Sequence, residues 1–178
     1  MSDKSARRPR TTLTLAEAVS RRLHERAQDE HAHAEDQHTA QAVARFMSEH
    51  DQFARHLGIE LLELRPGYSR VRLSLEPYMV NGLGLAHGAV IFAVADFAFA
   101  AACNSYGTVA VALSMDVHFL SSSRPGAVLF SEAQEIRCGR RTALYRLTVK
   151  DEQENLIADL HGMAYRKDTR FLENKNDV

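Results

Sequence analysis

A run of apolar residues from Gly88 to Ala102 dominates the hydrophobic pattern of the chain, with almost no polar position inside it. A helix that is apolar on every face is normally buried on every face. The run therefore predicts a helix that the rest of the domain covers on all sides. Asp96 is its only ionisable side chain, and an unpaired carboxylate in such a place destabilises the fold or has a raised pKa. Asp96 is thus either partnered for structure or kept for chemistry.

Strand-like alternation of apolar and polar residues appears elsewhere. Residues 70–75 and 145–150 alternate in the way that is typical of half-buried strands. Four more segments are expected to be strands: 59–64, 109–120, 127–137 and 156–166. Short turns separate the strands after the apolar helix, which favours an antiparallel meander over a doubly wound parallel sheet. The expected fold class is α+β, with an antiparallel sheet of about six strands wrapped around one long buried helix.

A helix is also expected before the first strand, and a separate arm before that helix. Apolar residues at roughly helical spacing predict a helix from Ala42 to Leu57, and Gly58 supplies its C-terminal stop. Composition changes near residue 40, since residues 1–39 are charged and poor in apolar side chains. We therefore expect an N-terminal extension, helical or flexible, at 1–39, one domain at 40–170, and a tail at 171–178.

The extension carries two patterns of its own. A modest amphipathic stripe consists of Leu13, Leu15, Val19 and Leu23. Three histidines, His31, His33 and His38, invite a metal site. No cysteine or paired acid completes a ligand set there, so a solvated helix face or a flexible segment is the better interpretation. Neither pattern assigns the extension a function.

Overall composition argues against several functional classes. The chain has 178 residues, 45% of them hydrophobic, which suffices for one sizeable core. A formal net charge of −1 gives no electrostatic case for a nucleic-acid partner. The two cysteines, Cys103 and Cys138, provide neither a disulfide framework nor a metal-binding pair. The first residues lack the hydrophobic core of a signal peptide, and no apolar run is long enough to cross a membrane. We therefore expect a cytoplasmic protein without a membrane partner.

The segment before the apolar helix, residues 81–88, contains three glycines and leads straight into that helix. The first N–H groups of a helix have no acceptor within the helix and lie at the positive end of its dipole. Gly88 can therefore donate a backbone hydrogen bond to an oxygen that gains negative charge, as in an oxyanion hole. By itself a glycine-rich turn is a weak signal, because it more often reflects turn geometry than a site.

Helix geometry limits how Gly88 and Asp96 can act together. Eight residues of helix span about 12 Å, whereas a base and an oxyanion donor must both lie about 3 Å from one reacting centre. One copy of the helix cannot supply both groups. If both act on one substrate, each comes from a different subunit, and a two-fold axis between antiparallel helices creates two equal sites. We expect a homodimer or homotetramer with its sites at subunit interfaces.

These residues carry a family resemblance that covers about residues 40–168. The matching positions are Asn81-Gly82, His87-Gly88, Phe92, Ala95-Asp96, 98–100 and 102–105. They resemble the signature of hotdog-fold acyl-CoA thioesterases of the phenylacetate-degradation (PaaI-type) group. The resemblance implies a hotdog fold and an acyl-CoA substrate, and we expect neither a cofactor nor a metal. It implies that Asp96 is the general base or nucleophile, that the Gly88 amide polarises the thioester carbonyl, and that Asn81 orients the carbonyl or the water.

Further candidates follow with weaker support. Ser114 stands two residues before an Asp, as in related thioesterases, which makes it a candidate to bind the attacking water or the catalytic acid; an ordinary strand serine is the alternative. His87 could donate to the substrate carbonyl, although a bond to backbone at the helix start is the more natural role. Ala89 replaces the second glycine of the family pattern and could narrow the acyl pocket. Three arginines suit coenzyme A phosphates, with solvated turn charges as the alternative: Arg140, Arg141 and Arg124.

Thioester hydrolysis fits this residue set, because the thiolate leaves readily and an activated water or carboxylate plus an oxyanion donor suffices. A hotdog hydratase or dehydratase is the enzymatic alternative, since His87 and Asp96 could form its His–acid pair, but the hydratase run Asp-x-Asn-Pro-x-x-His is missing. A non-catalytic acyl-CoA-binding module is the other alternative. The acyl group stays open among aryl-acetyl, benzoyl and medium-chain acyl groups. Spacing alone does not assign four aromatic residues to pocket or core: Phe92, Phe97, Phe99 and Tyr106.

Overall fold

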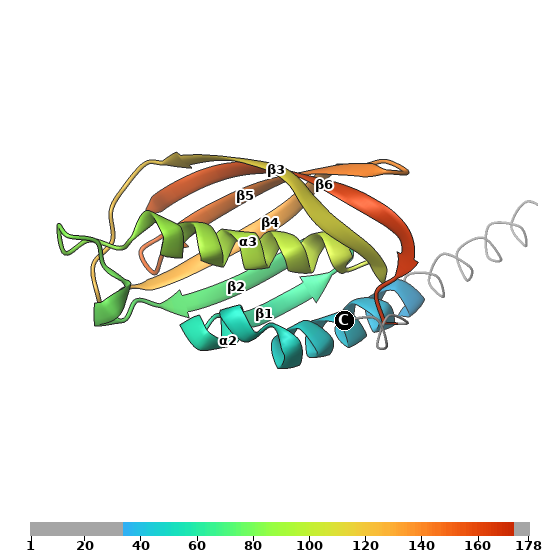
Figure 1. Cartoon of the computed structure of the whole chain (residues 1–178), viewed down its shortest axis with the longest axis horizontal. Helices are drawn as coiled ribbons and strands as arrows, with labels where there is room; N and C mark the ends of the chain where they lie inside the picture. The colour runs from blue at the N-terminus through green and yellow to red at the C-terminus, as the bar shows by residue number, and fades with distance from the viewer. Residues whose placement is uncertain (1–33, 173–178) are drawn as a thin grey trace, which may run out of the picture. The chain divides into compact units, whose positions relative to one another are not determined.

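The computed structural model describes residues 34–172, and within them one antiparallel sheet has the strand order β1-β2-β4-β5-β6-β3. The sheet curves around one helix, α3, Gly88–Asn104 (Figure 1). The strands are β1 Glu60–Arg65, β2 Tyr68–Ser74, β3 Thr108–Phe119, β4 Val128–Cys138, β5 Thr142–Asp151 and β6 Leu156–Arg170. The expected α+β architecture, a six-stranded antiparallel sheet around one long helix, is confirmed.

The last three strands form the expected meander, and β3 lies outside it. β4 pairs with β5 and β5 pairs with β6, each in antiparallel register. β3 pairs with β6 on one side, and its other side has no strand partner within residues 34–172. β1 forms the opposite edge with 6 residues, whereas β3 has 12. A long, unpaired edge strand is a ready place for pairing with a second chain.

The helix expected from Ala42 to Leu57 is in fact two helices, which corrects the sequence prediction. Residues 34–50 form the first helix, and α2, Gln52–Leu57, is the second. Asp51 separates them because its backbone is extended and its Oδ1 accepts a hydrogen bond from the Ala54 N–H at 2.9 Å. This is an N-cap, which starts a new helix rather than continuing the old one. The predicted stop at Gly58 is present, with φ of 75° and its N–H directed to the last carbonyls of α2.

The helix of residues 34–50 contains the expected boundary between residues 39 and 40, and the division into extension, domain and tail stays a prediction. His38 is exposed on this helix. The remaining features predicted for the extension lie outside the described residues: Leu13, Leu15, Val19, Leu23, His31 and His33. No helix within residues 34–172 combines the length and the apolar character needed to span a bilayer.

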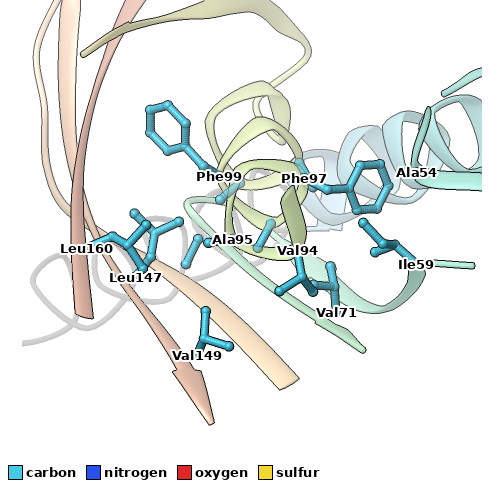
Figure 2. Close-up of a cluster of buried hydrophobic side chains, with 14 of the residues drawn as sticks. Ala54, Ile59, Val71, Val94, Ala95, Phe97, Phe99, Leu147, Val149 and Leu160 are labelled. Atoms are coloured by element: carbon cyan, nitrogen blue, oxygen red, sulfur yellow. The ribbon is translucent and has the colours of Figure 1, made fainter. Parts of the chain in front are cut away.

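A single hydrophobic core fills the space between α3 and the inner face of the sheet. Val94, Ala95 and Phe99 of α3 meet side chains from β2, β5 and β6 there, as Figure 2 shows. Fully burying one such aliphatic or aromatic side chain contributes about 1.5–3 kcal/mol. The sheet-side partners labelled in Figure 2 are Val71, Leu147, Val149 and Leu160. Phe97 and Phe99, which sequence spacing left unassigned, both belong to this core.

One stripe of α3 is left open, which corrects the expectation that the helix is covered on all sides. Ala89 is exposed, and Phe92, Asp96 and Ala100 are only partly buried. These positions are three and four residues apart, so they lie along one side of the helix. The sheet belongs to one chain and curves around only part of the helix. An alanine-rich helix is apolar all round, so its sequence gives no sign of which side stays uncovered.

The C-terminal end of α3 is fixed to β3 by Asn104. Its Oδ1 accepts from the Ala110 N–H at 2.8 Å, and its Nδ2 donates to the carbonyls of Ala100 at 2.9 Å and Ala110 at 3.1 Å. Next to it, the Ser105 hydroxyl donates to the Ala102 carbonyl and accepts from the Gly67 N–H. These buried polar groups are therefore satisfied, and they hold the helix in one position along the edge strand.

Candidate active site

An apolar groove of about 570 Å³ runs along the open stripe of α3, between this helix and the end of β3. It contains Gly88 and Asp96, two of the residues singled out from the sequence. The complete lining is Phe53, Gly88, Ala89, Phe92, Ala93, Asp96, Val117 and Phe119. Phe92 thus belongs to the groove, whereas Tyr106 lines a different recess.

His87 forms the N-cap of α3. Its Nδ1 accepts a hydrogen bond from the Ala89 N–H at 3.0 Å, and its own backbone N–H donates to the Met79 carbonyl at 2.9 Å. With Nδ1 occupied as an acceptor, the neutral ring carries its proton on Nε2. The imidazole therefore holds the start of the helix, which is the backbone-bonding role weighed from the sequence. It does not line the groove.

The Gly88 amide is the free donor at the start of α3. Within residues 34–172 its N–H has no hydrogen-bond acceptor, while the Ala89 N–H is taken by His87 and the Val90 N–H by the His87 carbonyl. A Cβ on Gly88 would lie 3.3 Å from Cζ of Phe119, so the ring packs close to the bare Cα. The lack of a side chain leaves the amide and the ring together at one end of the groove.

Asn81 organises the loop before the helix. Its Oδ1 accepts hydrogen bonds from the Leu83 N–H at 2.9 Å and the Leu85 N–H at 3.3 Å, and its backbone N–H donates to the Leu85 carbonyl. Asn side chains commonly hold turns in this way. The side-chain oxygen is therefore occupied, and the Nδ2 amide is the group left to donate to another molecule.

Asp96 is the ionisable side chain of the groove. It is partly buried, and its carboxylate has no hydrogen-bond partner within the described part of the chain. Loss of contact with water raises the pKa of the Asp96 carboxyl, and the negative charge of Asp51 raises it further. A carboxylate in this state is a stronger proton acceptor than an ordinary Asp. Asp51 is the residue that caps α2, so this short helix brings a charge near the site.

Gly88 and Asp96 share the groove but cannot reach the same atom. They are eight positions apart on one continuous helix, a separation of about 12 Å along its axis. A single chain therefore presents a donor at one end of the groove and a carboxylate at the other.

Ser114 does not lie in the groove. It pairs with Met163 of β6, while its neighbour Met115 pairs with Gly162, which packs against the Phe99 ring on the inner side of the sheet. Side chains alternate along a strand, so Ser114 is on the outer side. A bulge between Ala112 and Ser114 inserts one extra residue into β3. Beyond the bulge, the residues that face the inner side of the sheet are therefore Met115 and Val117 instead of Ser114 and Asp116.

The three candidate arginines lie at two ends of the fold. Arg124 is exposed in the loop between β3 and β4, beside Ser123, whose carbonyl accepts from the N–H of Ala86 just before α3. Arg140 and Arg141 are exposed in the turn between β4 and β5. Arg140 also lines a recess of about 400 Å³ that is rich in cationic side chains. That recess is formed by Thr108, Arg140, Arg166, Lys167, Asp168, Thr169 and Arg170.

Sequence reasoning missed the three groove residues that lie outside α3. Phe53 comes from α2, and Val117 and Phe119 come from the last residues of strand β3. Their only sequence signal is that they are large and apolar, and the two segments are distant from α3 along the chain. Within the described part of the chain, no three His, Cys, Asp or Glu side chains gather closely enough to hold a metal ion.

Comparison with known proteins identifies the family of this chain. The model of the Thioesterase superfamily matches residues 83–158. The acyl-coenzyme A thioesterase PaaI of Escherichia coli K12 is 34% identical over 129 residues, which are 72% of this chain and 92% of that protein.

Two solved structures have the same fold. The structure of E. coli PaaI, from the phenylacetic acid degradation operon, superposes with a TM-score of 0.74 at 33% identity, covering 75% of this chain and 97% of that one. A protein from Thermus thermophilus superposes with a TM-score of 0.63 at 37% identity, covering 65% and 97%. The chain therefore belongs to the thioesterase superfamily, in the PaaI-type group of hotdog-fold acyl-CoA thioesterases. The resemblance stated from residues 81–105 is confirmed.

Replacing Asp51 by Asn should lower the pKa of Asp96, because the change removes a negative charge while the amide oxygen can still accept from the Ala54 N–H. If ionised Asp96 is the working form, the acid limb of the pH profile of kcat/KM moves to lower pH. Carbon-13 NMR titration of the Asp96 carboxyl, recorded beside the pH–rate profile, measures both effects. Glu49→Gln serves as a charge-removal control. An Asp96 pKa that stays fixed or rises in Asp51→Asn contradicts the coupling.

Proposed function

We propose that this enzyme hydrolyses an aryl-acetyl-CoA or similar thioester to the free acid and coenzyme A, with Asp96 as general base or nucleophile and the Gly88 N–H as oxyanion donor from the neighbouring subunit. One observation carries the proposal: a carboxylate with a raised pKa and a helix-start amide, neither of which has a hydrogen-bond partner within residues 34–172, lie in the same apolar groove. The E. coli relative PaaI, an acyl-coenzyme A thioesterase from the phenylacetic acid degradation operon, supports this choice of substrate.

The chemistry needs little beyond these two groups. Asp96 removes a proton from water, or attacks the thioester carbon itself, and the carbonyl oxygen becomes an oxyanion beside the Gly88 N–H. The bond between carbon and sulfur then breaks, and the thiolate of coenzyme A leaves without a strong general acid. In the general-base route the proton held by Asp96 passes to the thiolate or to solvent. In the nucleophilic route water hydrolyses the mixed anhydride formed on Asp96, which releases the free acid and restores the carboxylate. The Nδ2 group of Asn81 is free to orient the carbonyl or the water. His87 supports the donor by capping the helix at Ala89.

A second copy of the chain completes each site in this proposal. The separation of about 12 Å requires Gly88 and Asp96 to come from different subunits. The unpaired edge of β3 and the open stripe of α3 lie beside the same groove, which supports an antiparallel second copy along that edge. Val111 and Leu113, on the same strand, are 42% and 55% exposed, so the edge also offers apolar surface to cover.

The positions of the arginines divide them between two sites. Arg124 lies near the start of α3 and can serve the coenzyme bound at Gly88 of its own chain. Arg140 lies beside Thr108, nine strand residues and about 30 Å before Val117 of the groove. In an antiparallel dimer the groove of the partner subunit lies closer to Thr108, at the start of β3, than the groove of the same chain does. Arg140 and Arg141 therefore bind the phosphates of the coenzyme A that occupies the partner's groove. Ser114 faces the outer side of the sheet, which gives no support to its predicted role of binding the attacking water or the catalytic acid, and that role stays a prediction. The cytoplasmic location also stays a prediction.

The two alternative functions, an enoyl-CoA hydratase and a non-catalytic acyl-CoA-binding module, predict different results when the protein is assayed with a panel of acyl-CoA substrates. A hydratase would add water to an enoyl-CoA, and a binding module would show saturable binding without turnover. The hydrogen bond from the Ala89 N–H to His87 Nδ1 works against a His–acid pair, because it engages the imidazole at the helix start. Free thiol released from phenylacetyl-CoA and from aliphatic acyl-CoA substrates distinguishes hydrolysis from both alternatives.

Asp96→Asn should abolish thioester hydrolysis while leaving acyl-CoA binding largely intact, because the amide keeps the shape but cannot act as base or nucleophile. Since folding raises the pKa of Asp96, this carboxyl favours the fold at low pH, and that contribution is lost as pH rises through the raised pKa. The free energy of unfolding of Asp96→Asn at neutral pH should therefore equal or exceed that of wild type. Thiol-release kinetics and urea unfolding measure the two effects. Asp116→Asn, an exposed change outside the groove, is the matched control, and near-normal turnover of Asp96→Asn would remove the catalytic assignment.

Mixing two inactive variants should restore activity if the sites are shared. Gly88→Pro removes the amide donor at the first helical position, where proline is tolerated, and the extended ψ of 135° at His87 suits a following proline. Mixed with Asp96→Asn, it forms heterodimers with one doubly altered site and one intact site. Random reassortment puts about half of the dimers in the mixed state, so roughly a quarter of wild-type activity should return.

Gly88→Ala is the control for this experiment, because it adds a Cβ near Phe119 but keeps the N–H. It should retain far more activity than Gly88→Pro. Native mass spectrometry establishes whether heterodimers form. Heterodimers without activity would show that Gly88 and Asp96 do not meet across an interface.

Replacing Arg140 and Arg141 together by Ala should raise KM for acyl-CoA with a smaller change in kcat, because contacts remote from the reacting carbon contribute mainly uniform binding. The effect should largely vanish with pantetheine thioesters, which lack the nucleotide phosphates. Steady-state kinetics with both substrate types measure it, and Arg137→Ala, another exposed arginine on β4, is the control. Equal losses on both substrate types would assign the two arginines to the fold instead.

A further inference from the structure

We propose that Phe53 of α2 is a specificity-determining residue that contacts the acyl group and selects neutral, apolar, ring-containing acyl chains. The inference rests on the proposed thioester hydrolysis and adds to it a residue and a substrate class. Neither the sequence pattern nor the family resemblance pointed to Phe53, which is brought into the groove only by the folding of α2 beside α3.

Phe53 is an exposed ring on a fixed backbone. Its side chain is 65% exposed, yet its neighbour Ala54 is buried in the core and secures α2 there. Asp51 caps one end of this six-residue helix and Gly58 closes the other. A large apolar side chain held in place at the mouth of a cleft is typical of a ligand contact, because binding removes its surface from water without much ordering cost.

The chemistry of the groove defines the class of acyl group. Phe53, Phe92 and Phe119 come from three different elements and present three aromatic rings to one space. The ionisable lining residue is Asp96, and the lining includes no Lys, Arg or His. A carboxylated acyl group such as succinyl would meet like charge and no cation. A neutral aromatic ring can pack edge-on or offset against the phenylalanines.

Phe53 can be changed without touching the proposed reacting groups. Phe119 packs close to Gly88, so its replacement would also disturb the oxyanion donor. The three atoms nearest to a Cβ on Gly88 all belong to Phe119, whereas Phe53 belongs to the separate helix α2. The Phe53 side chain carries no polar atom, so its replacement removes neither the Gly88 donor nor the Asp96 carboxylate. Changes at Phe53 should alter acyl recognition and leave the chemical step in place.

The test compares kcat/KM for phenylacetyl-CoA and acetyl-CoA in wild type, Phe53→Ala and Phe53→Leu. Phe53→Ala should lower the phenylacetyl-to-acetyl ratio by roughly ten- to a hundredfold, as expected when one apolar wall of a pocket is lost, and Phe53→Leu should lower it less. Gln52→Ala, on the same helix, and Leu62→Ala, an exposed apolar change on β1, should leave the ratio unchanged. A ratio that stays constant in Phe53→Ala overturns the proposal.

A charge introduced at the same position tests the contact from the opposite direction. Phe53→Arg should raise the ratio of kcat/KM for succinyl-CoA over butyryl-CoA by about tenfold or more, because a cation then faces the acyl carboxylate. No change in that ratio would also overturn the proposal. Binding of the non-hydrolysable thioether analogues of phenylacetyl-CoA and acetyl-CoA, measured by calorimetry, gives the same comparison without turnover. Failure of the hydrolysis proposal, seen as no thiol release by wild type, is thereby distinguished from failure of the Phe53 proposal, seen as equal affinity ratios in wild type and Phe53→Ala.

Discussion

The incomplete cover of α3 is the constraint from which the rest of this structure follows. A helix of 17 residues that is apolar on all sides needs a surface around its whole circumference, and the curved sheet of one chain supplies only part of it. The uncovered stripe therefore becomes the floor of a groove. Asp96 is tolerated in the apolar run because it stands on this stripe and not against the sheet. The same incomplete cover gives the carboxylate its partial burial and so its raised pKa.

The position of α3 along β3 decides what else reaches the groove. Asn104 and Ser105 bind one end of the helix to Ala110 and Gly67. The other end is fixed by the His87 cap, whose backbone in turn bonds to Met79. With both ends held, the last residues of β3 lie opposite the first turns of the helix. Phe119 then faces Gly88, and the amide donor is left in an apolar setting where a hydrogen bond to an oxyanion is worth more than in water.

Local patterns were enough to predict most of the fold and to single out Gly88 and Asp96, which both line the candidate groove. Alternation of period two identified two of the six strands, and the contrast between Asp96 and its apolar neighbours identified the carboxylate, because both are properties of adjacent residues. The break at Asp51 was missed because apolar spacing continues on both sides of it and only the cap bond to Ala54 reveals it. The outward direction of Ser114 depends on a bulge, which inserts one residue without changing the composition of the strand. Phe53 joins the groove through packing between distant segments, and no local pattern encodes such packing.

In the proposed dimer, one continuous helix, α3, contributes to two catalytic centres. The donor at Gly88 serves one active site and the carboxylate at Asp96 serves the other, yet both belong to one continuous helix. Any axial shift of that helix when an acyl group binds therefore repositions a reacting group in each centre at once. Two occupied sites are then energetically coupled without a separate effector site, and the size of that coupling is set by how firmly Asn104 and His87 hold the ends of the helix.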